Sequence, residues 1–187
     1  MSEPFLLKPG DFFCSHTPKW FGSLIRIGSR SLGEERTKVN HTGVVAITGT
    51  LDSAVIVEAL SKVKAHTVEE SYRGSKTKVA FFRFNGLTDD QKEAWSRKAF
   101  DYVGRRYGVL KIVTHALDYF LNGAYVFRRL TRSDRYPICS WVTAYVAEAI
   151  GKNFGKDPGA VQPDDIWDYA LAHPEEIQLL RPLISIP

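Results

Sequence analysis

The sequence predicts a single α+β domain in which helices pack on an antiparallel sheet of about five to six strands. The first half carries short runs of β-branched and apolar residues, whereas the second half changes to the apolar period typical of helices. Strands followed by helices within one domain are typical of the α+β class. The chain has 187 residues, 44% of them hydrophobic, which is enough apolar mass for one core. We therefore expect residues 1–187 to form one domain.

The expected strands lie mainly in the first half of the chain, and turn residues bound most of them. They are the short strand that follows the turn in Lys8–Cys14, then His41–Thr48, Ala54–Leu60, Lys64–Glu69 and Lys78–Phe84, with a last strand over Ile177–Leu183. Gly49–Asp52 is the expected turn of the hairpin that begins at His41. The strands from His41 to Phe84 are expected in meander order, which favours antiparallel pairing.

The expected helices lie mainly in the second half. Thr88–Gln91 carries a capping signature, so a helix should begin there and run to about Val103. Pro163 favours the start of a short helix that reaches Ala170, because proline is tolerated in the first turn. Two further helices are expected over Trp20–Ile27 and Val109–Phe120.

A further helix is expected to begin at Cys139. Apolar residues then recur with helical spacing at Val142, Tyr145, Val146, Ala149 and Ile150. Pro137 disfavours helix for the residue before it, and Gly151 is placed to end the helix. Cys139 therefore falls in or next to the first turn, where the free backbone N–H groups and the helix dipole favour thiolate over thiol. A thiolate is a nucleophile, and it needs a base.

His41 is the strongest candidate for that base among the five histidines. It begins a strand, and Gly43 leaves room for close backbone approach. If the hairpin turn centres on Gly49–Thr50, His41 lies opposite Glu58 and on the same face of the sheet. A register shifted by two residues keeps them on one face, whereas a shift by one separates them. Glu58 interrupts an apolar run, where a carboxylate is costly unless paired; the alternative is that it ends its strand at the surface.

Cys139, His41 and Glu58 together provide a nucleophile, a base and a group that orients the base. Backbone N–H groups near the helix start would stabilise an oxyanion. From the residues alone, a buried and inert Cys139 with an unrelated His41 remains the alternative.

The other histidines favour structural roles. His66 is expected in a strand, His115 in a helix and His173 near the surface. Cys14 and His16 could touch a metal from one strand face, but a structural pair is favoured. Because the sequence has no HxxxH motif and no clustered Cys and His residues, we expect no metal and no cofactor.

Charge and cysteine content exclude few function classes. The net charge of +4 is compatible with an anionic partner but demands none, so nucleic-acid binding is not expected. The densest basic run, Arg128–Arg135, favours a solvated loop, with an electropositive rim near Cys139 as the alternative. Two cysteines cannot form a disulfide framework, which fits a reducing compartment. The sequence has neither a signal peptide pattern nor a transmembrane run, so we expect a cytoplasmic protein or delivery by a phage or secretion route.

Three short motifs resemble those of a known family. They are Asn40–Val45, Val57–Ala59 and Tyr136–Val142, and in this order they resemble the circularly permuted NlpC-type amidases. That family belongs with the lecithin–retinol acyltransferase-like, papain-related hydrolases. The resemblance implies a papain-like fold in which the His-bearing strand precedes the Cys-bearing helix, the reverse of papain. It also implies that His41, Glu58 and Cys139 are the catalytic residues.

The resemblance extends from about Gly10 to Ile166, and its weight lies in the order and spacing of the motifs. It includes Gly10–Asp11 and the Pro-x-Asp stretch of Gln162–Ile166. It also indicates that Tyr107, Tyr136 and Ser140 are candidate oxyanion or substrate contacts. Trp141 departs from the family pattern, which often has Glu after Cys-Ser, and Arg105–Gly108 replaces a more acidic turn. These departures leave substrate choice open.

By this kinship the chain is expected to cleave an amide bond through a thioester intermediate, in peptidoglycan peptides first of all. A lipid acyltransferase or esterase using the same residues is the second hypothesis, with a lipid or acyl substrate in place of a bacterial cell-wall peptide. The third is a non-catalytic binding or virion component that retained the fold.

Overall fold

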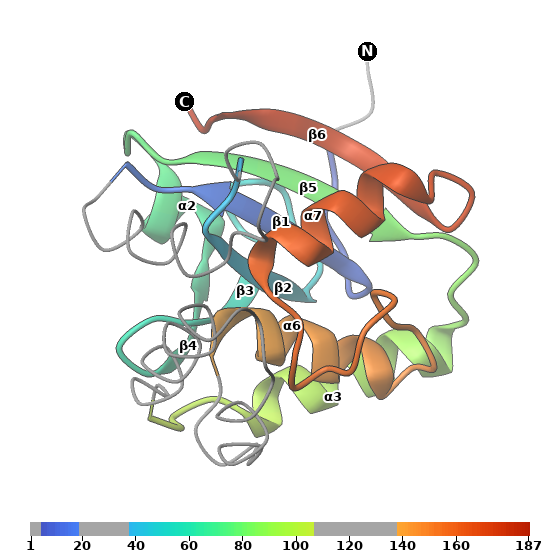
Figure 1. Ribbon diagram of the computed structural model, residues 1–187. Coiled ribbons are helices and arrows are strands. Elements are labelled where there is room, and N and C mark those ends of the chain that lie inside the picture. Colours follow the sequence, from blue (N-terminus) through green and yellow to red (C-terminus); the bar gives the residue numbers. More distant parts are fainter. Residues whose placement is uncertain (1–4, 19–37, 107–137) are drawn as a thin grey trace.

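The structure is a computed structural model of the chain, and it describes residues 5–18, 38–106 and 138–187 (Figure 1). The strands are β1 (Asp11–His16), β2 (His41–Ile47), β3 (Val55–Ala59), β4 (Val63–Thr67), β5 (Lys78–Phe84) and β6 (Ile177–Ser185). The helices are α2 (Val68–Tyr72), α3 (Asp89–Asp101), α6 (Cys139–Glu148) and α7 (Pro163–Ala172). The helices expected over Trp20–Ile27 and Val109–Phe120 lie outside the described residues.

The strands form one antiparallel sheet in the order β4-β3-β2-β1-β5-β6. This confirms the α+β class and the antiparallel sheet. The expected meander order is wrong for β5, which pairs with β1 on the far side of β2 instead of following β4. Thr67 and Glu70 form a capping box that ends β4 and begins α2, so the expected strand Lys64–Glu69 stops early. The chain then leaves the sheet edge and returns at β5.

Each face of the sheet packs against its own apolar core, because successive side chains of a strand point to opposite faces. On one face, Phe12, Val44 and Phe82 pack with the buried sides of α3, α6 and α7. Figure 1 shows α3 and α6 side by side below the sheet, and these two helices contact each other and β2. Trp95 of α3 donates from its indole Nε1 to the carbonyl oxygen of Val45 at 2.8 Å, which fixes that helix to β2.

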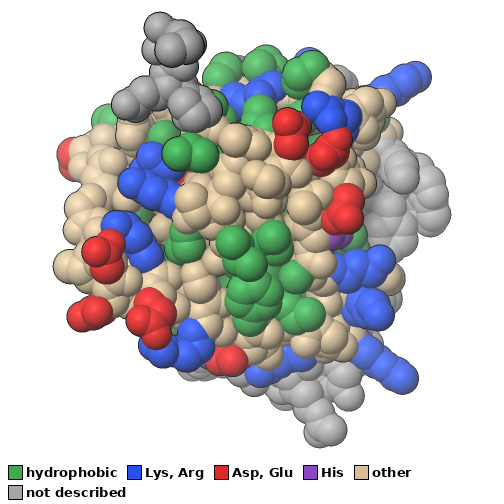
Figure 2. Space-filling view, turned by 180° about the vertical axis from the view of Figure 1, so that it is seen from behind, with side chains coloured by type: hydrophobic (Ala, Val, Ile, Leu, Met, Phe, Trp, Pro, Cys, Tyr) green, Lys and Arg blue, Asp and Glu red, His purple; other side chains and the backbone are tan. Residues whose placement is uncertain are grey.

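The second face carries a smaller core that includes Phe13, Val45, Ile56 and residues of α2. Figure 2 shows the molecule from behind, with hydrophobic side chains gathered near the centre and Lys and Arg side chains toward the margins. Within the parts of the chain that the structure describes, no helix has the length and hydropathy needed to cross a bilayer. His41 and Glu58 occupy strand positions on the same face of the sheet as this smaller core.

A buried ion pair joins β1 to β5. Arg83 donates to both carboxylate oxygens of Asp11, from Nε at 2.6 Å and from Nη2 at 2.7 Å. Asp11 is fully buried, and it also accepts from the backbone N–H of Lys8. Gly10 before it has φ +96°, in the left-handed region that favours glycine. The Gly10–Asp11 motif therefore has a structural role at the sheet.

Candidate functional site

Helix α6 presents Cys139 at its first residue, as the sequence predicts. The preceding Ile138 is extended, and the cysteine is 3% exposed. Ser140 donates from Oγ to the carbonyl oxygen of Val161 at 2.7 Å, which fixes the first turn of the helix. Thr143 donates from Oγ1 to Oγ1 of Thr42 at 3.1 Å, which holds the same turn against β2. The helix is buried on nearly all sides, beyond the single stripe that the periodicity indicates.

His41 is the first residue of β2, and its side chain is 15% exposed. The hairpin register differs by two residues from the one expected, because Glu58 lies opposite Gly43 and not opposite His41. A register shift between Val45 and Ile47 and a turn that runs on to Ala54 account for the difference. The two side chains still share a face, and His41 donates from Nε2 to Oε2 of Glu58.

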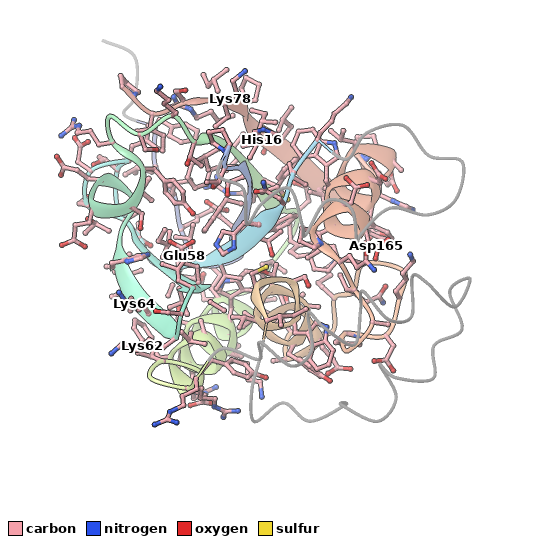
Figure 3. All side chains as sticks on the ribbon, turned by 60° about the vertical axis from the view of Figure 1, so that its left-hand side comes forward. His16, Glu58, Lys62, Lys64, Lys78 and Asp165 are labelled. Atoms are coloured by element: carbon pink, nitrogen blue, oxygen red, sulfur yellow. The ribbon has the colours of Figure 1, made fainter. Side chains whose placement is uncertain are left out.

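The sulfur of Cys139 lies beside the same imidazole, and each group shifts the pKa of the other. Because Nε2 is engaged by Glu58, Nδ1 is the ring nitrogen left for the sulfur. The structure therefore brings together Cys139, His41 and Glu58, which come from α6, β2 and β3. Figure 3 shows Glu58 well inside the outer edge of the sheet, where Lys62 and Lys64 lie.

Glu58 is 1% exposed and accepts hydrogen bonds from four side chains. Oε2 accepts from His41 and from the hydroxyl of Tyr72 at 2.7 Å. Oε1 accepts from Nε2 of His66 at 2.6 Å and from Oγ of Ser71 at 3.1 Å. A buried carboxylate with this many donors is stable as an anion. Glu58 is therefore paired, as the sequence predicts, and it has three hydrogen-bond donors in addition to His41.

Gly43 makes the approach of Phe13 and Glu58 sterically possible. A Cβ placed on Gly43 would lie 2.6 Å from ring atoms of Phe13 and 2.9 Å from Cβ of Glu58. We expect Gly43→Ala to destabilise the protein by about 1–3 kcal/mol, since a well-packed core resists added volume. Urea unfolding monitored by tryptophan fluorescence measures this change. An unchanged midpoint would show that the strands move apart without cost.

Charges within the site favour an ion pair of Cys139 and His41. Burial alone lowers the pKa of His41, but the sulfur of Cys139 and the carboxylate of Glu58 raise it to about 10. Burial raises the pKa of Cys139, but the His41 charge and backbone N–H groups of Thr42 and Ser140 outweigh it and lower that pKa. Burial likewise raises the pKa of Glu58, and its hydrogen bonds from His41, His66 and Tyr72 hold it well below the usual range.

Cys14 has the opposite character although it is also buried. Burial raises the pKa of its thiol well above the ordinary value, and the nearby Asp164 and Asp168 raise it further. Cys14 lies opposite Thr42 in the β1–β2 ladder, and among the described residues no imidazole partners its thiol. His16, for which the sequence favours a structural role with Cys14 over metal binding, lies with its Nδ1 3.0 Å from the carbonyl oxygen of Lys38.

Sequence reasoning missed His66, Ser71 and Tyr72 as partners of Glu58. The signal for His66 was available, because the hairpin between β3 and β4 pairs Glu58 with Lys64 and alternation then puts His66 on the same face. The signal for α2 was its capping box, which lies in a segment expected to be a strand. Tyr107 and Tyr136, the other candidate contacts, lie outside the described residues. Ser140 is described, and its hydroxyl is engaged by Val161.

The chain was compared with known proteins. No sequence-family profile matches the chain. No curated protein matches it. Among solved structures it is similar to the crystal structure of metalloprotein yiiX from Escherichia coli O157:H7, DUF1105, with a TM-score of 0.55 and 17% identity. The alignment covers 98% of this chain and 90% of that chain. At this identity the likeness extends to the fold alone, so the site of this chain is interpreted from its own geometry.

Proposed function

We propose that the chain is a thiol hydrolase in which Cys139 is the nucleophile, His41 the general acid and base, and Glu58 the residue that orients the imidazole. The supporting observation is that one imidazole donates to the buried carboxylate and couples electrostatically to the buried sulfur. Covalent acyl chemistry requires a nucleophile next to a base, and a third group that orients the base. A fold of the permuted papain-like type, as the motifs imply, belongs to the same proposal.

The proposed reaction begins when the Cys139 thiolate attacks a carbonyl carbon and a carbon–sulfur bond forms. The carbonyl oxygen becomes an oxyanion, which backbone N–H groups near the start of α6 stabilise. The tetrahedral species collapses, the carbon–nitrogen bond breaks, and the amine leaves with the proton from His41. Water then gives a proton to His41 and attacks the thioester. The carboxylic acid is released, and the Cys139–His41 ion pair is restored.

The motif resemblance supports an amide bond as the substrate, and a peptidoglycan peptide is the leading candidate. Transfer of the acyl group to a lipid or another acceptor would use the same first half-reaction, with a hydroxyl or amine in place of water. The two reactions are distinguished by the product that forms from one acyl donor with and without the added acceptor. A non-catalytic role would leave the sulfur unreactive.

The fold neighbour is described as a metalloprotein, so we considered whether this site fits a metal. Among the residues that the structure describes, no three His, Cys, Asp or Glu side chains are arranged to hold a metal ion. Nε2 of His41 and Nε2 of His66 both donate to the Glu58 carboxylate, so both nitrogens are already used as hydrogen-bond donors. The donor set does not fit a metal, and no step is assigned to one.

Alkylation by iodoacetamide tests the proposed nucleophile, because the reagent reacts with the thiolate form of cysteine. We expect Cys139 to react at about pH 6, well below the ordinary thiol pKa of about 8.5, and at least about tenfold faster than N-acetylcysteine. The sign follows from the shifts: the ion pair forms above the lowered Cys139 pKa and is lost as pH rises through about 10, where His41 deprotonates. Cys14 should stay unlabelled. Mass spectrometry of tryptic peptides identifies the labelled cysteine.

His41→Ala is the control variant for this profile. Without the imidazolium, the reactivity of Cys139 should rise only at alkaline pH, as in an ordinary thiol. If the wild-type protein already shows that alkaline profile, the proposed nucleophile is rejected.

A further inference from the structure

Glu58 is shared between two imidazoles, only one of which faces the sulfur. His41 binds Oε2, and His66 binds Oε1 at 2.6 Å from the neighbouring edge strand β4. The side chain of Glu58 is 1% exposed, whereas that of His66 is 16% exposed. Figure 3 shows Glu58 between the interior of the sheet and the edge at which Lys64 lies. The carboxylate therefore joins the proposed catalytic pair to a second imidazole.

Helix α2 supplies the remaining donors to this carboxylate. Tyr72 donates to the oxygen that faces His41, and Ser71 donates to the oxygen that faces His66. Ser71 also lies 2.9 Å from Nε2 of His66. Each carboxylate oxygen thus has two donors, so a tilt of the carboxylate plane would weaken all four contacts at once. This fixes the plane of the Glu58 carboxylate so that one of its two equivalent oxygens is directed at His41.

These contacts differ from ordinary packing of α2 on the sheet. Packing is supplied by Val68, which is fully buried, and by the ring of Tyr72, which meets Phe13 edge-on at 5.6 Å between centroids. The hydroxyl of Tyr72 adds nothing to that ring contact; it donates to Glu58, and Ser15 is a further polar neighbour of it. Loss of the hydroxyl therefore separates orientation of Glu58 from packing of the helix.

We propose that His66 and Tyr72 are positioning residues, which hold Glu58 ionised and directed at His41 through the hydrogen bonds that they donate. The inference rests on the proposed function and adds a second layer of residues to it. In their absence, only His41 and Ser71 would offset the burial of Glu58, which favours its neutral form. The imidazolium of His41 would then lose its carboxylate partner, and the Cys139 thiolate would lose its stabilising charge. The titratable groups that face His66 are Glu58 from β3 and Glu70 from α2.

The test uses three variants of the full chain and two measurements. His66→Leu removes the donor, His66→Gln retains an N–H donor on a side chain of similar reach, and Tyr72→Phe removes only the hydroxyl. His173→Gln is the control, because His173 stacks on Tyr169 and lies outside the network. The first measurement is the pH profile of Cys139 alkylation by iodoacetamide. The second is the low-field ring proton that His41 shares with Glu58, observed by proton NMR.

We expect His66→Leu to move the inflection of the alkylation profile upward by about one pH unit, which lowers the rate about tenfold at pH values below the wild-type inflection. Tyr72→Phe should act in the same direction, and His66→Gln should stay within about threefold of wild type because it keeps the donor. In His66→Leu the low-field proton should broaden or disappear. The His173→Gln profile should match wild type.

An unchanged or faster profile in both His66→Leu and Tyr72→Phe, with the low-field proton retained, would overturn the inference. Equal loss in His66→Gln and His66→Leu would also overturn it, because the donated hydrogen bond would then be irrelevant. Failure of the hydrolase proposal is recognised separately, by an ordinary alkaline thiol profile in the wild-type protein. In that case the NMR signal of the variants still decides whether His66 and Tyr72 position Glu58.

Discussion

Cys139→Ala is expected to abolish acyl chemistry and to leave the fold intact. The assay uses p-nitrophenyl acetate, a general acyl donor, and peptides with γ-D-glutamyl amide bonds. Removal of the nucleophile leaves only binding and oxyanion stabilisation, so we expect a loss of at least about 10³-fold in kcat/KM. The wild-type protein should also show a burst of p-nitrophenolate and the mass of one added acetyl group on Cys139. The variant should show neither.

Cys14→Ala is the matched control for this substitution, since both cysteines are buried in the same core. It should retain the activity of the wild-type protein, because Cys14 has a raised pKa and no place in the proposed reaction. Both alanine variants should lose about 1 kcal/mol of stability or less, which is the usual scale for a small change in a core. Undiminished turnover in Cys139→Ala would refute the assignment of the nucleophile.

Glu58→Gln is expected to have the second largest effect, although the two side chains have nearly the same shape. An amide offers one oxygen, whereas the site presents donors to both carboxylate oxygens. The amide NH₂ must therefore face either His41 and Tyr72 or His66 and Ser71, which are themselves donors. The charge that stabilises the His41 imidazolium is also removed. We expect kcat/KM to fall by about 10² to 10⁴-fold, the scale seen when the orienting carboxylate of a hydrolase is replaced by an amide.

The same substitution should lower stability by about 1–3 kcal/mol, because buried donors are left without acceptors. The stability of the wild-type protein also depends on pH through Glu58. Its folded-state pKa is lowered, so its contribution is present above the pKa of the unfolded chain and is lost as pH falls toward the folded value. Glu58→Gln should therefore be less sensitive to acid than wild type in urea unfolding at a series of pH values.

Glu69→Gln is the control for Glu58→Gln, because Glu69 is partly exposed on α2 and forms an ion pair with Arg73. It should change stability by less than about 0.5 kcal/mol and leave activity unaltered. If Glu58→Gln is as active as this control, the acidic residue has no part in the reaction. The cysteine and the histidine would then act as a pair.

Much of the local structure was predictable from the sequence, because local structure depends on neighbouring residues. The helical period after Cys139 and the capping signature at Thr88 both mark helices that the structure contains. Alternation and turn residues located the strands, including β6. The cost of burying a lone carboxylate indicated that Glu58 needs a partner. Chain-local rules of this kind state what an element is and which face it buries.

What only the tertiary structure decided is how those elements meet. The register of β2 on β3 depends on an irregularity near Val45 and on the length of the turn. After α2 the chain returns to the sheet at β5, which pairs with β1 and not with β4. The approach of His41 to Cys139 and the convergence of His66 and Tyr72 on Glu58 join segments far apart in sequence. Such contacts depend on the packing of the whole core, whose many weak interactions act together and leave no local pattern in the chain.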